Sequence, residues 1–421
     1  MERKFQSAVR ESTRRSIEDI GHADIIVGIP CYFSQSTVEK VMLQAAEGLN
    51  RYFPEKRSVI IISDGGSTDD TREVASMAEI HYPSVSKITS IYRGVPGKGS
   101  AIREVLEIGV FLNAGTVIFV DSDLRSITPE WIRNLAEPVI AGSDFVTPDY
   151  NRYKFDGTIT NTIVYNLTRA LFGADIRQPI GGDFAVSKKL AAFYLSKDVW
   201  DTDVARFGID IWMTVNAIAG RFKLCQTRLG AKIHGEKDPS CDLSSMFRQV
   251  VGTIFSMLEE YEDFWKNNHG STAVPVTGEF VGMEAPAFKI NEKALIEYFK
   301  TGFTNFSGVW KKILERSDYD ELVSLSCADN DQVLLKDETW VRIVYSYACA
   351  FHLSRLQRFK LLDTMIPLYY CRVASLIKQL KYKDHDEAEK FFDSQAVLFR
   401  SMKGFLMNKW DDAKKRRGYI R

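Results

Sequence analysis

Two carboxylates one residue apart, Asp121 and Asp123, directly follow the apolar run 116–120. A buried strand that ends in this way presents hard oxygen ligands, which suit Mg²⁺ or Mn²⁺. Such an ion usually keeps several waters and shares phosphate oxygens with a substrate. An isolated Asp-x-Asp is a weak signal, because acidic residues also cap helices and turns. The motifs that precede and follow it therefore decide how it is interpreted.

A strand, a turn and the start of a helix are predicted over 60–71, with Asp64 at the end of the strand. Gly65 and Gly66 permit a tight turn and the close approach of a ligand. Asp64 is an acceptor that can bind a base N–H or a ribose hydroxyl. The alternative is that Asp64 only caps the turn.

Lys98 lies in the segment Pro96-Gly97-Lys98-Gly99, immediately before a predicted helix. Backbone N–H groups at a helix N-terminus form a natural anion site, and the ammonium group adds a point charge suited to phosphate. The spacing is not that of a Walker P-loop. In isolation, an exposed turn lysine would be the default interpretation.

A turn rich in small residues contains Gly181, Gly182 and Asp183, and Asp210 lies at the start of a later predicted helix. The glycines would let the backbone come close to a sugar, and both carboxylates can accept hydrogen bonds from sugar hydroxyls. The alternatives are an Asx turn for Asp183 and a helix N-cap region for Asp210.

His234 ends the last strand predicted before the helical half and stands beside Gly235. A neutral imidazole at a strand end is a plausible further ligand for Mn²⁺ or Mg²⁺. A purely structural histidine is the alternative.

Apolar strands alternate with amphipathic helices through the first half of the chain. This pattern predicts a mostly parallel sheet covered on both faces, with ligands beyond the carboxyl ends of its strands. The polar clusters fall at that edge. The predicted strands cover 25–29, 59–63, 88–92, 117–120, 144–147, 184–187 and 222–233, and the helices between them cover 37–51, 99–112, 129–141, 160–172 and 209–219.

After about residue 243 the strand signals fade, and the rest of the chain is predicted to be helical. The fold class is therefore α/β, with a helical C-terminal region. Two domains are expected, a nucleotide-binding catalytic domain over 1–242 and a helical domain over 243–421 that serves the acceptor side, oligomerisation or both. The helices are predicted at 246–265, 292–300, 307–315, 339–359, 364–381 and 387–406, and 270–286 is predicted to be a linker.

Composition narrows the class of protein. The 421 residues are 45% hydrophobic, enough for a sizeable core and two domains. Lys+Arg and Asp+Glu are both 55, so charge predicts neither nucleic-acid nor anionic-membrane binding. The six cysteines include no C-x-x-C pair, which favours a reducing compartment. No signal core or membrane span is found, so a cytoplasmic protein is expected.

The ordered series resembles glycosyltransferases of the GT-A fold. More narrowly, it resembles the retaining family that contains glucosyl-3-phosphoglycerate synthase and glucosylglycerate synthase. The likeness covers residues 25–235, half of the chain. The strongest matches are Gly66-Ser67-Thr68-Asp69-Asp70-Thr71, Pro96-Gly97-Lys98-Gly99, Phe119-Val120-Asp121-Ser122-Asp123-Leu124 and Gln178-Pro179-Ile180-Gly181-Gly182-Asp183-Phe184.

The resemblance implies a nucleoside-diphosphate sugar as donor and a divalent metal, Mg²⁺ or Mn²⁺, as cofactor. Asp123 and His234 would ligate the metal, and Asp121 would assist through the ribose or a water. The residues implied to carry catalysis are Asp123, Lys98 and Asp210. The residues implied to bind substrate are Pro30, Cys31, Tyr32, Asp64, Gly97, Lys98, Asp121, Ser122, Gly181, Gly182, Asp183, Asp210 and Glu236.

Three positions depart from the family pattern. Asp183 and Asp210 stand where the family usually has glutamate, and Glu236 stands where it has an asparagine near the acceptor. A carboxylate at 236 would repel a phosphorylated acceptor, which favours glycerate over 3-phosphoglycerate. Arg152, Lys154 and Arg177 could bind an acceptor carboxylate.

The expected function is metal-dependent, retaining transfer of a hexose, with glucose expected, to glycerate or a related small acceptor. Three alternatives stay open. An inverting GT-A transferase could act on a polyprenyl phosphate or a saccharide, with Asp183 or Asp210 as base. A nucleotidyltransferase could make the sugar nucleotide, or a non-enzymatic protein could sense it. A homodimer is also possible.

Overall fold

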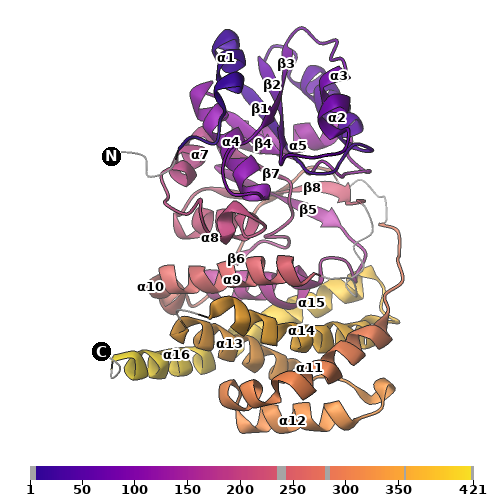
Figure 1. Ribbon diagram of the computed structural model, residues 1–421, viewed down its shortest axis with the longest axis vertical. Coiled ribbons are helices and arrows are strands. Elements are labelled where there is room, and N and C mark those ends of the chain that lie inside the picture. The colour runs from indigo at the N-terminus through magenta and orange to yellow at the C-terminus, as the bar shows by residue number, and fades with distance from the viewer. Residues whose placement is uncertain (1–5, 235–242, 280–284, 355–356, 419–421) are drawn as a thin grey trace. The chain divides into compact units, whose positions relative to one another are not determined.

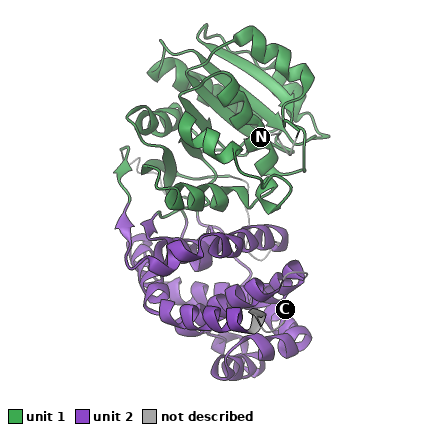
Figure 2. Cartoon of the chain, turned by 90° about the vertical axis from the view of Figure 1, so that its left-hand side faces the viewer, with its two compact units in different colours: residues 1–152, 176–235, 274–286 green, residues 153–175, 236–273, 287–421 purple. Residues whose placement is uncertain are grey.

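The computed structural model describes residues 6–234, 243–279, 285–354 and 357–418. Within it the chain divides into two compact units (Figure 2). The first comprises residues 1–152, 176–235 and 274–286, and the second comprises 153–175, 236–273 and 287–421. The units interleave along the sequence, whereas the sequence predicts a single boundary between 242 and 243.

The first unit is built on one sheet, in which the described strands follow the order β10-β8-β5-β7-β4-β1-β2-β3 (Figure 1). Neighbouring strands are parallel, except that β7 runs antiparallel to both β4 and β5. The strands are β1 (Ile25–Cys31), β2 (Ser58–Asp64), β3 (Val85–Ile91), β4 (Thr116–Phe119), β5 (Phe145–Asn151), β7 (Phe184–Ser187), β8 (Leu224–Ala231) and β10 (Val276–Thr277).

Helices cover both faces of this sheet. On one face the side chains of Ile25, Val27 and Ile29 belong to a buried apolar cluster that includes residues of α2 and α5. On the other face α4 approaches β1 closely, since a Cβ on Gly28 would lie 2.5 Å from Cγ1 of Val105. The helices of this unit are α1 (Glu11–Ile20), α2 (Val38–Tyr52), α3 (Thr71–Met77), α4 (Lys98–Phe111), α5 (Pro129–Ile140), α7 (Lys188–Leu195) and α8 (Ile209–Ala219).

The second unit is helical apart from a two-stranded pair, β6 (Ala174–Asp175) with β9 (Thr272–Ala273). The predicted α/β class with a helical C-terminal region is confirmed. A helical segment over 160–172, as predicted, contains two stretches of wider turns around α6 (Tyr165–Leu167). The other helices are α9 (Ser244–Glu260), α10 (Glu262–Asn267), α11 (Glu292–Ile313), α12 (Arg316–Cys327), α13 (Asp337–Leu353), α14 (Arg358–Leu380), α15 (His385–Ser401) and α16 (Lys403–Gly418).

Two predictions about this half are wrong. The linker predicted at 270–286 contains β9 and β10, and β10 extends the large sheet by pairing with β8. The helices predicted at 292–300 and 307–315 are one continuous helix, α11. Within the described part of the chain, every helix is too short or too polar to cross a membrane.

Candidate active site

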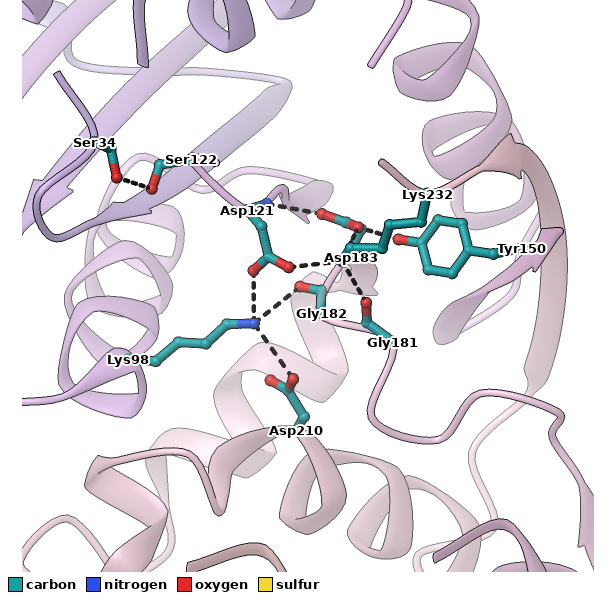
Figure 3. Close-up of polar contacts among 10 residues, drawn as sticks. All are labelled: Ser34, Lys98, Asp121, Ser122, Tyr150, Gly181, Gly182, Asp183, Asp210 and Lys232. Carbon is teal, nitrogen blue, oxygen red and sulfur yellow. Dashed lines mark hydrogen bonds and ion pairs between the residues drawn. The ribbon is translucent and has the colours of Figure 1, made fainter. Parts of the chain in front are cut away.

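Four neighbouring strands, β8, β5, β7 and β4, each bring one polar side chain to the same edge of the sheet (Figure 3). Lys232 follows β8, Tyr150 lies near the end of β5, and Asp121 follows β4. Asp183 precedes β7, and it reaches this edge because β7 is antiparallel to its neighbours. The reversed direction of β7 therefore brings Asp183 to residues that are far from it in sequence.

Lys232 is the centre of this group. Its Nζ donates to Asp121 Oδ2 at 2.7 Å, to the Gly181 carbonyl at 2.8 Å and to Asp183 Oδ2 at 2.9 Å. Asp183 also accepts hydrogen bonds from the Tyr150 hydroxyl and, at 2.7 Å, from the Asp121 backbone N–H. A buried ion pair needs such additional hydrogen bonds to offset the cost of removing its charges from water.

Lys98 binds the opposite oxygen of Asp121 from the first residue of α4. Its Nζ lies 2.8 Å from Asp121 Oδ1, 3.3 Å from Asp210 Oδ2 and 3.4 Å from the Gly182 carbonyl. Figure 3 shows the three charged side chains directed toward one another. Both oxygens of Asp121 are thus occupied by ammonium groups.

The site holds three carboxylates and two ammonium groups, and their pKa values respond accordingly. Burial would raise the pKa of Asp121, but Lys232 and Lys98 hold it well below its ordinary value. Burial would lower the pKa of Lys98, yet Asp121 and Asp210 outweigh it and raise that pKa. Burial raises the pKa of Asp183 and of Asp210, and the neighbouring lysines offset only part of this effect.

The two carboxylate oxygens of Asp210 differ in their hydrogen bonding. Its Oδ2 faces Lys98, whereas its Oδ1 is buried and has no hydrogen-bond partner among the described residues. A buried carboxylate oxygen without a partner is costly. Asp210 Oδ1 is therefore suited to accept a hydrogen bond from a hydroxyl group of a ligand.

Glycines are required where the backbone touches this network. Gly182 has φ +92°, and a Cβ there would lie 2.3 Å from Asp121 Oδ2. A Cβ on Gly181 would lie 2.2 Å from Cγ of Pro148. Both glycine carbonyls accept hydrogen bonds from the lysines described above. The backbone of the turn at 181–182 therefore contacts the charged side chains directly.

The segment before α4 differs from the expectation that it offers backbone N–H groups to an anion. The Gly97 N–H donates to the Tyr92 hydroxyl at 2.9 Å, and the Gly99 N–H donates to the Arg206 carbonyl at 3.2 Å. A Cβ on Gly99 would lie 1.8 Å from the Val204 carbonyl oxygen. These glycines pack the helix start onto the segment before α8, which brings Lys98 to Asp210.

Residues 26–184 match the model of the family described as "Glycosyl transferase family 2". This stretch is therefore similar to family 2 glycosyltransferases. The resemblance expected from the motifs is thereby confirmed.

Curated relatives match a larger share of the chain than the family model does. Glucosyl-3-phosphoglycerate synthase of Mycolicibacterium paratuberculosis is 28% identical over 216 residues, which are 47% of this chain and 62% of the relative. The enzyme of that name from Mycobacterium tuberculosis is 26% identical over 253 residues, 55% of this chain and 72% of the relative. The chain thus spans less than two thirds of the length of the first of these relatives.

A solved structure aligns with part of the chain at lower identity. Glucosyl-3-phosphoglycerate synthase of Mycobacterium tuberculosis, in complex with Mn²⁺, uridine diphosphate and phosphoglyceric acid, is 23% identical and aligns with a TM-score of 0.44. The alignment covers 57% of this chain and 82% of that one.

The predicted metal ligands lie on adjoining segments. Asp123 and His234 are both half-buried. Between their segments, the Arg125 N–H donates to the Ile233 carbonyl at 2.8 Å, and the Ile233 N–H donates to Ser126 Oγ at 2.9 Å. Glu236, predicted to face the acceptor, lies outside the described residues.

The residues predicted to bind the nucleotide differ in their burial and hydrogen bonding. Asp64 is fully buried and accepts hydrogen bonds from the N–H groups of Gly66 at 2.8 Å and Ser67 at 2.9 Å, a geometry that supports the turn-capping alternative. Cys31 is buried, which raises the pKa of its thiol, and its carbonyl accepts from the Gly65 N–H. Tyr32 is 62% exposed.

Two other predicted positions lie beside these residues. Pro30 is half-buried in β1. Ser122 is buried, and its Oγ lies 2.7 Å from Ser34 Oγ, which joins the segment after β4 to the segment after β1 (Figure 3).

Sequence reasoning did not identify Lys232 or Tyr150. Both contact Asp183, one from the end of β8 and one from the end of β5, and such pairing across strands cannot be read from local spacing. A lysine that interrupts an apolar strand end two residues before His234 was the available signal. Of the three basic residues considered for the acceptor, Lys154 donates to the carbonyls of Lys381 and Lys383 within the second unit.

Proposed function

We propose that this protein is a metal-dependent, retaining hexosyltransferase that moves glucose from a nucleoside-diphosphate donor to glycerate or a related small acceptor. The family 2 match and the names of the curated relatives support the reaction class. The bond from the sugar C1 to the diphosphate breaks, and a bond from C1 to an acceptor oxygen forms. The proton of that acceptor oxygen passes to the departing phosphate oxygen, so no protein base is required.

The observation that carries the proposal is the triad of Lys98, Asp121 and Asp210. Asp121 and Asp210 hold the Lys98 ammonium in place, and these carboxylates keep it charged against the opposing effect of burial. A preorganised cation at such a site stabilises charge that develops on a leaving group. The unpartnered Oδ1 of Asp210 would accept a hydroxyl of the donor sugar.

Asp123 and His234 would hold the divalent metal. Their donor set, a carboxylate and an imidazole, fits Mn²⁺ or Mg²⁺. No group of three or more His, Cys, Asp or Glu side chains in the described residues is arranged to hold an ion. Diphosphate oxygens and water would therefore complete the coordination shell, as is usual for these ions. When bound, the ion would neutralise charge on the diphosphate.

The experiment is a screen of nucleoside-diphosphate sugars, with uridine, guanosine and adenosine as the nucleoside and glucose and mannose as the sugar. Glycerate and 3-phosphoglycerate serve as acceptors, each with Mn²⁺ and with Mg²⁺. We expect transfer of glucose to glycerate, stronger than transfer to 3-phosphoglycerate. The product from an α-linked donor should be α-linked by NMR. A β-linked product would instead support the inverting alternative, and nucleotide-sugar binding without turnover would support a sensor.

A substitution of Asp123 tests the assignment of the metal ligands. Asp123→Ala should abolish transfer, because only one protein ligand would remain, and should leave the thermal unfolding curve unchanged. Asp19→Ala, which removes an exposed carboxylate on α1, is the control and should retain full activity. Near-normal transfer by Asp123→Ala, or full activity in excess EDTA, would contradict the assignment.

A further inference from the structure

Lys232 has no donor left for a ligand. An ammonium group has three N–H donors, and those of Lys232 meet Asp121 Oδ2, the Gly181 carbonyl and Asp183 Oδ2. Only 4% of its side chain is exposed. The residue therefore acts on other protein groups and does not itself bind a substrate.

The partners of Lys232 place it between two functional segments. Asp121 lies two residues before Asp123, and Lys232 itself lies two residues before His234. The ion pair at 2.7 Å thus joins the two segments that carry the predicted metal ligands. On the far side of Asp123, the Arg125 N–H donates to the Ile233 carbonyl, and the Ile233 N–H donates to Ser126 Oγ.

From this geometry we propose that Lys232 is a positioning residue that sets the separation of Asp123 and His234. The inference rests on the proposed function, since it takes these two residues as the metal ligands. Without the Lys232 ammonium, the Asp121 carboxylate would be held only by Lys98, which lies on a different element. Of the ties described above, only the hydrogen bonds of 125–126 to Ile233, on the far side of Asp123, would still join the segments after β4 and β8. The ligand pair would then open, and Mn²⁺ would bind more weakly.

A competing explanation is that Lys232 only balances buried charge. Lys232→Met and the double variant Lys232→Met with Asp183→Asn separate the two. The double variant removes one ammonium and one carboxylate, so the balance of buried charge is kept, but the tie to Asp121 is still absent. Positioning and charge balance therefore predict different results for it.

The probe is Mn²⁺ alone, titrated into the full chain and followed by the EPR signal of free Mn²⁺, with thermal unfolding in parallel. We expect Lys232→Met to weaken Mn²⁺ binding about tenfold or more, the effect typical of groups that orient metal ligands. In the double variant stability should recover while Mn²⁺ binding stays weak. If Lys232→Met does not fold, the double variant alone carries the test.

Lys87→Met is the matched control. The Lys87 Nζ also makes three hydrogen bonds within the chain, to the carbonyls of Ala75, Ser76 and Ala78, but it lies on β3 at the other end of the sheet. Its loss should leave Mn²⁺ binding unchanged.

Three outcomes would overturn the inference: wild-type Mn²⁺ affinity in Lys232→Met, recovery of Mn²⁺ binding together with stability in the double variant, or no Mn²⁺ binding by the wild-type chain. The proposed function fails separately. If the wild-type chain transfers no sugar in the donor screen but its Mn²⁺ binding depends on Lys232, the positioning role stands and the reaction is wrong.

Discussion

Gly182 shows how tightly single residues are constrained at the sheet edge. Its positive φ and its contact with the Asp121 carboxylate leave no room for a side chain. Gly142 also has a positive φ, +104°, but a Cβ there would meet nothing within 4 Å. A side chain at either position would strain the backbone, but only at Gly182 would it also overlap the Asp121 carboxylate. Comparing the two substitutions therefore separates the effect of backbone strain from the effect of displacing Asp121.

We expect Gly142→Ala to cost about 1 kcal/mol of unfolding free energy from strain alone, with sugar transfer unchanged. Gly182→Ala should cost more and should reduce transfer by about 100-fold, because the Asp121 carboxylate must move. Urea unfolding and initial rates measure both quantities. Equal activity in the two variants would show that the Asp121 position is not critical.

Glu104 predicts a pH dependence of stability. Its side chain is fully buried beneath β2 and β3, and Oε2 accepts from Ser63 Oγ at 2.6 Å and from Ser90 Oγ at 2.7 Å. Burial raises the pKa of Glu104 from 4.5 to about 7; the charge of Glu107 raises it further, and Arg10 opposes.

Because the folded state holds this proton more tightly, its stabilising effect is complete below pH 4.5 and is lost as pH rises to about 7. Between pH 5 and pH 8 the wild-type chain should lose about 2–3 kcal/mol relative to Glu104→Gln. Urea unfolding of both proteins at the two pH values measures this difference. If the unfolding free energies of the two proteins changed equally with pH, the pKa of Glu104 in the folded state would lie near its ordinary value.

At the residue scale, the sequence located most of the polar network. Lys98, Asp121, Asp183 and Asp210 were predicted from local motifs, and the structure brings all four together. Lys232 was missed, since its partners come from other strands and a lysine near a turn normally suggests a solvated charge. The roles of the predicted residues in binding stay predictions.

Among the elements, α11 shows why helix boundaries were misjudged. The segment 301–306, which contains Gly302 together with two threonines and an asparagine, was predicted to be a break between two helices. The helix continues because Gly302 is buried against α14, where a Cβ would lie 2.2 Å from Cβ of Pro367. Tertiary packing overrides low helix propensity here. The strands were predicted more reliably, because their apolar runs are buried on both faces.

The two glycines of α11 give opposite predictions. Gly302→Ala should destabilise the second unit by about 1–3 kcal/mol, because the added methyl group overlaps Pro367. Gly308→Ala should stabilise it by about 0.5–1 kcal/mol, because nothing lies within 4 Å of its Cβ and alanine favours the helix. Thermal unfolding of both variants is the measurement. Changes of the same sign would contradict this account of the packing.

At the scale of the whole molecule, the interleaving of the units decides which fragments can fold. The segment 153–175 belongs to the second unit, where the Thr162 carbonyl accepts a hydrogen bond from Trp340 Nε1 at 2.8 Å and Ile163 and Leu171 are buried. The predicted boundary at 242/243 would separate this segment from its partners. The predicted homodimer and cytoplasmic location stay predictions.

A fragment of residues 1–242 should therefore expose apolar surface, bind the dye ANS and elute from size exclusion as aggregates. The same fragment with 153–175 replaced by a short Gly/Ser linker should be monodisperse and bind little dye, because every strand of the sheet except the two-residue edge strand β10 is kept. A monodisperse 1–242 fragment without dye binding would show that 153–175 does not need the second unit.

The reversed direction of β7 also has an architectural consequence. β5 and β7 are adjacent and antiparallel, so they have the topology of a hairpin. The loop of this hairpin extends from 152 to 183. Its two stems begin and end at the same rim, so the loop can change in length without shifting the pairing of β5 with β7. Insertions and deletions that diversify related proteins should accumulate in the part of this loop before Gly181, because Gly181, Gly182 and Asp183 contact the charged network.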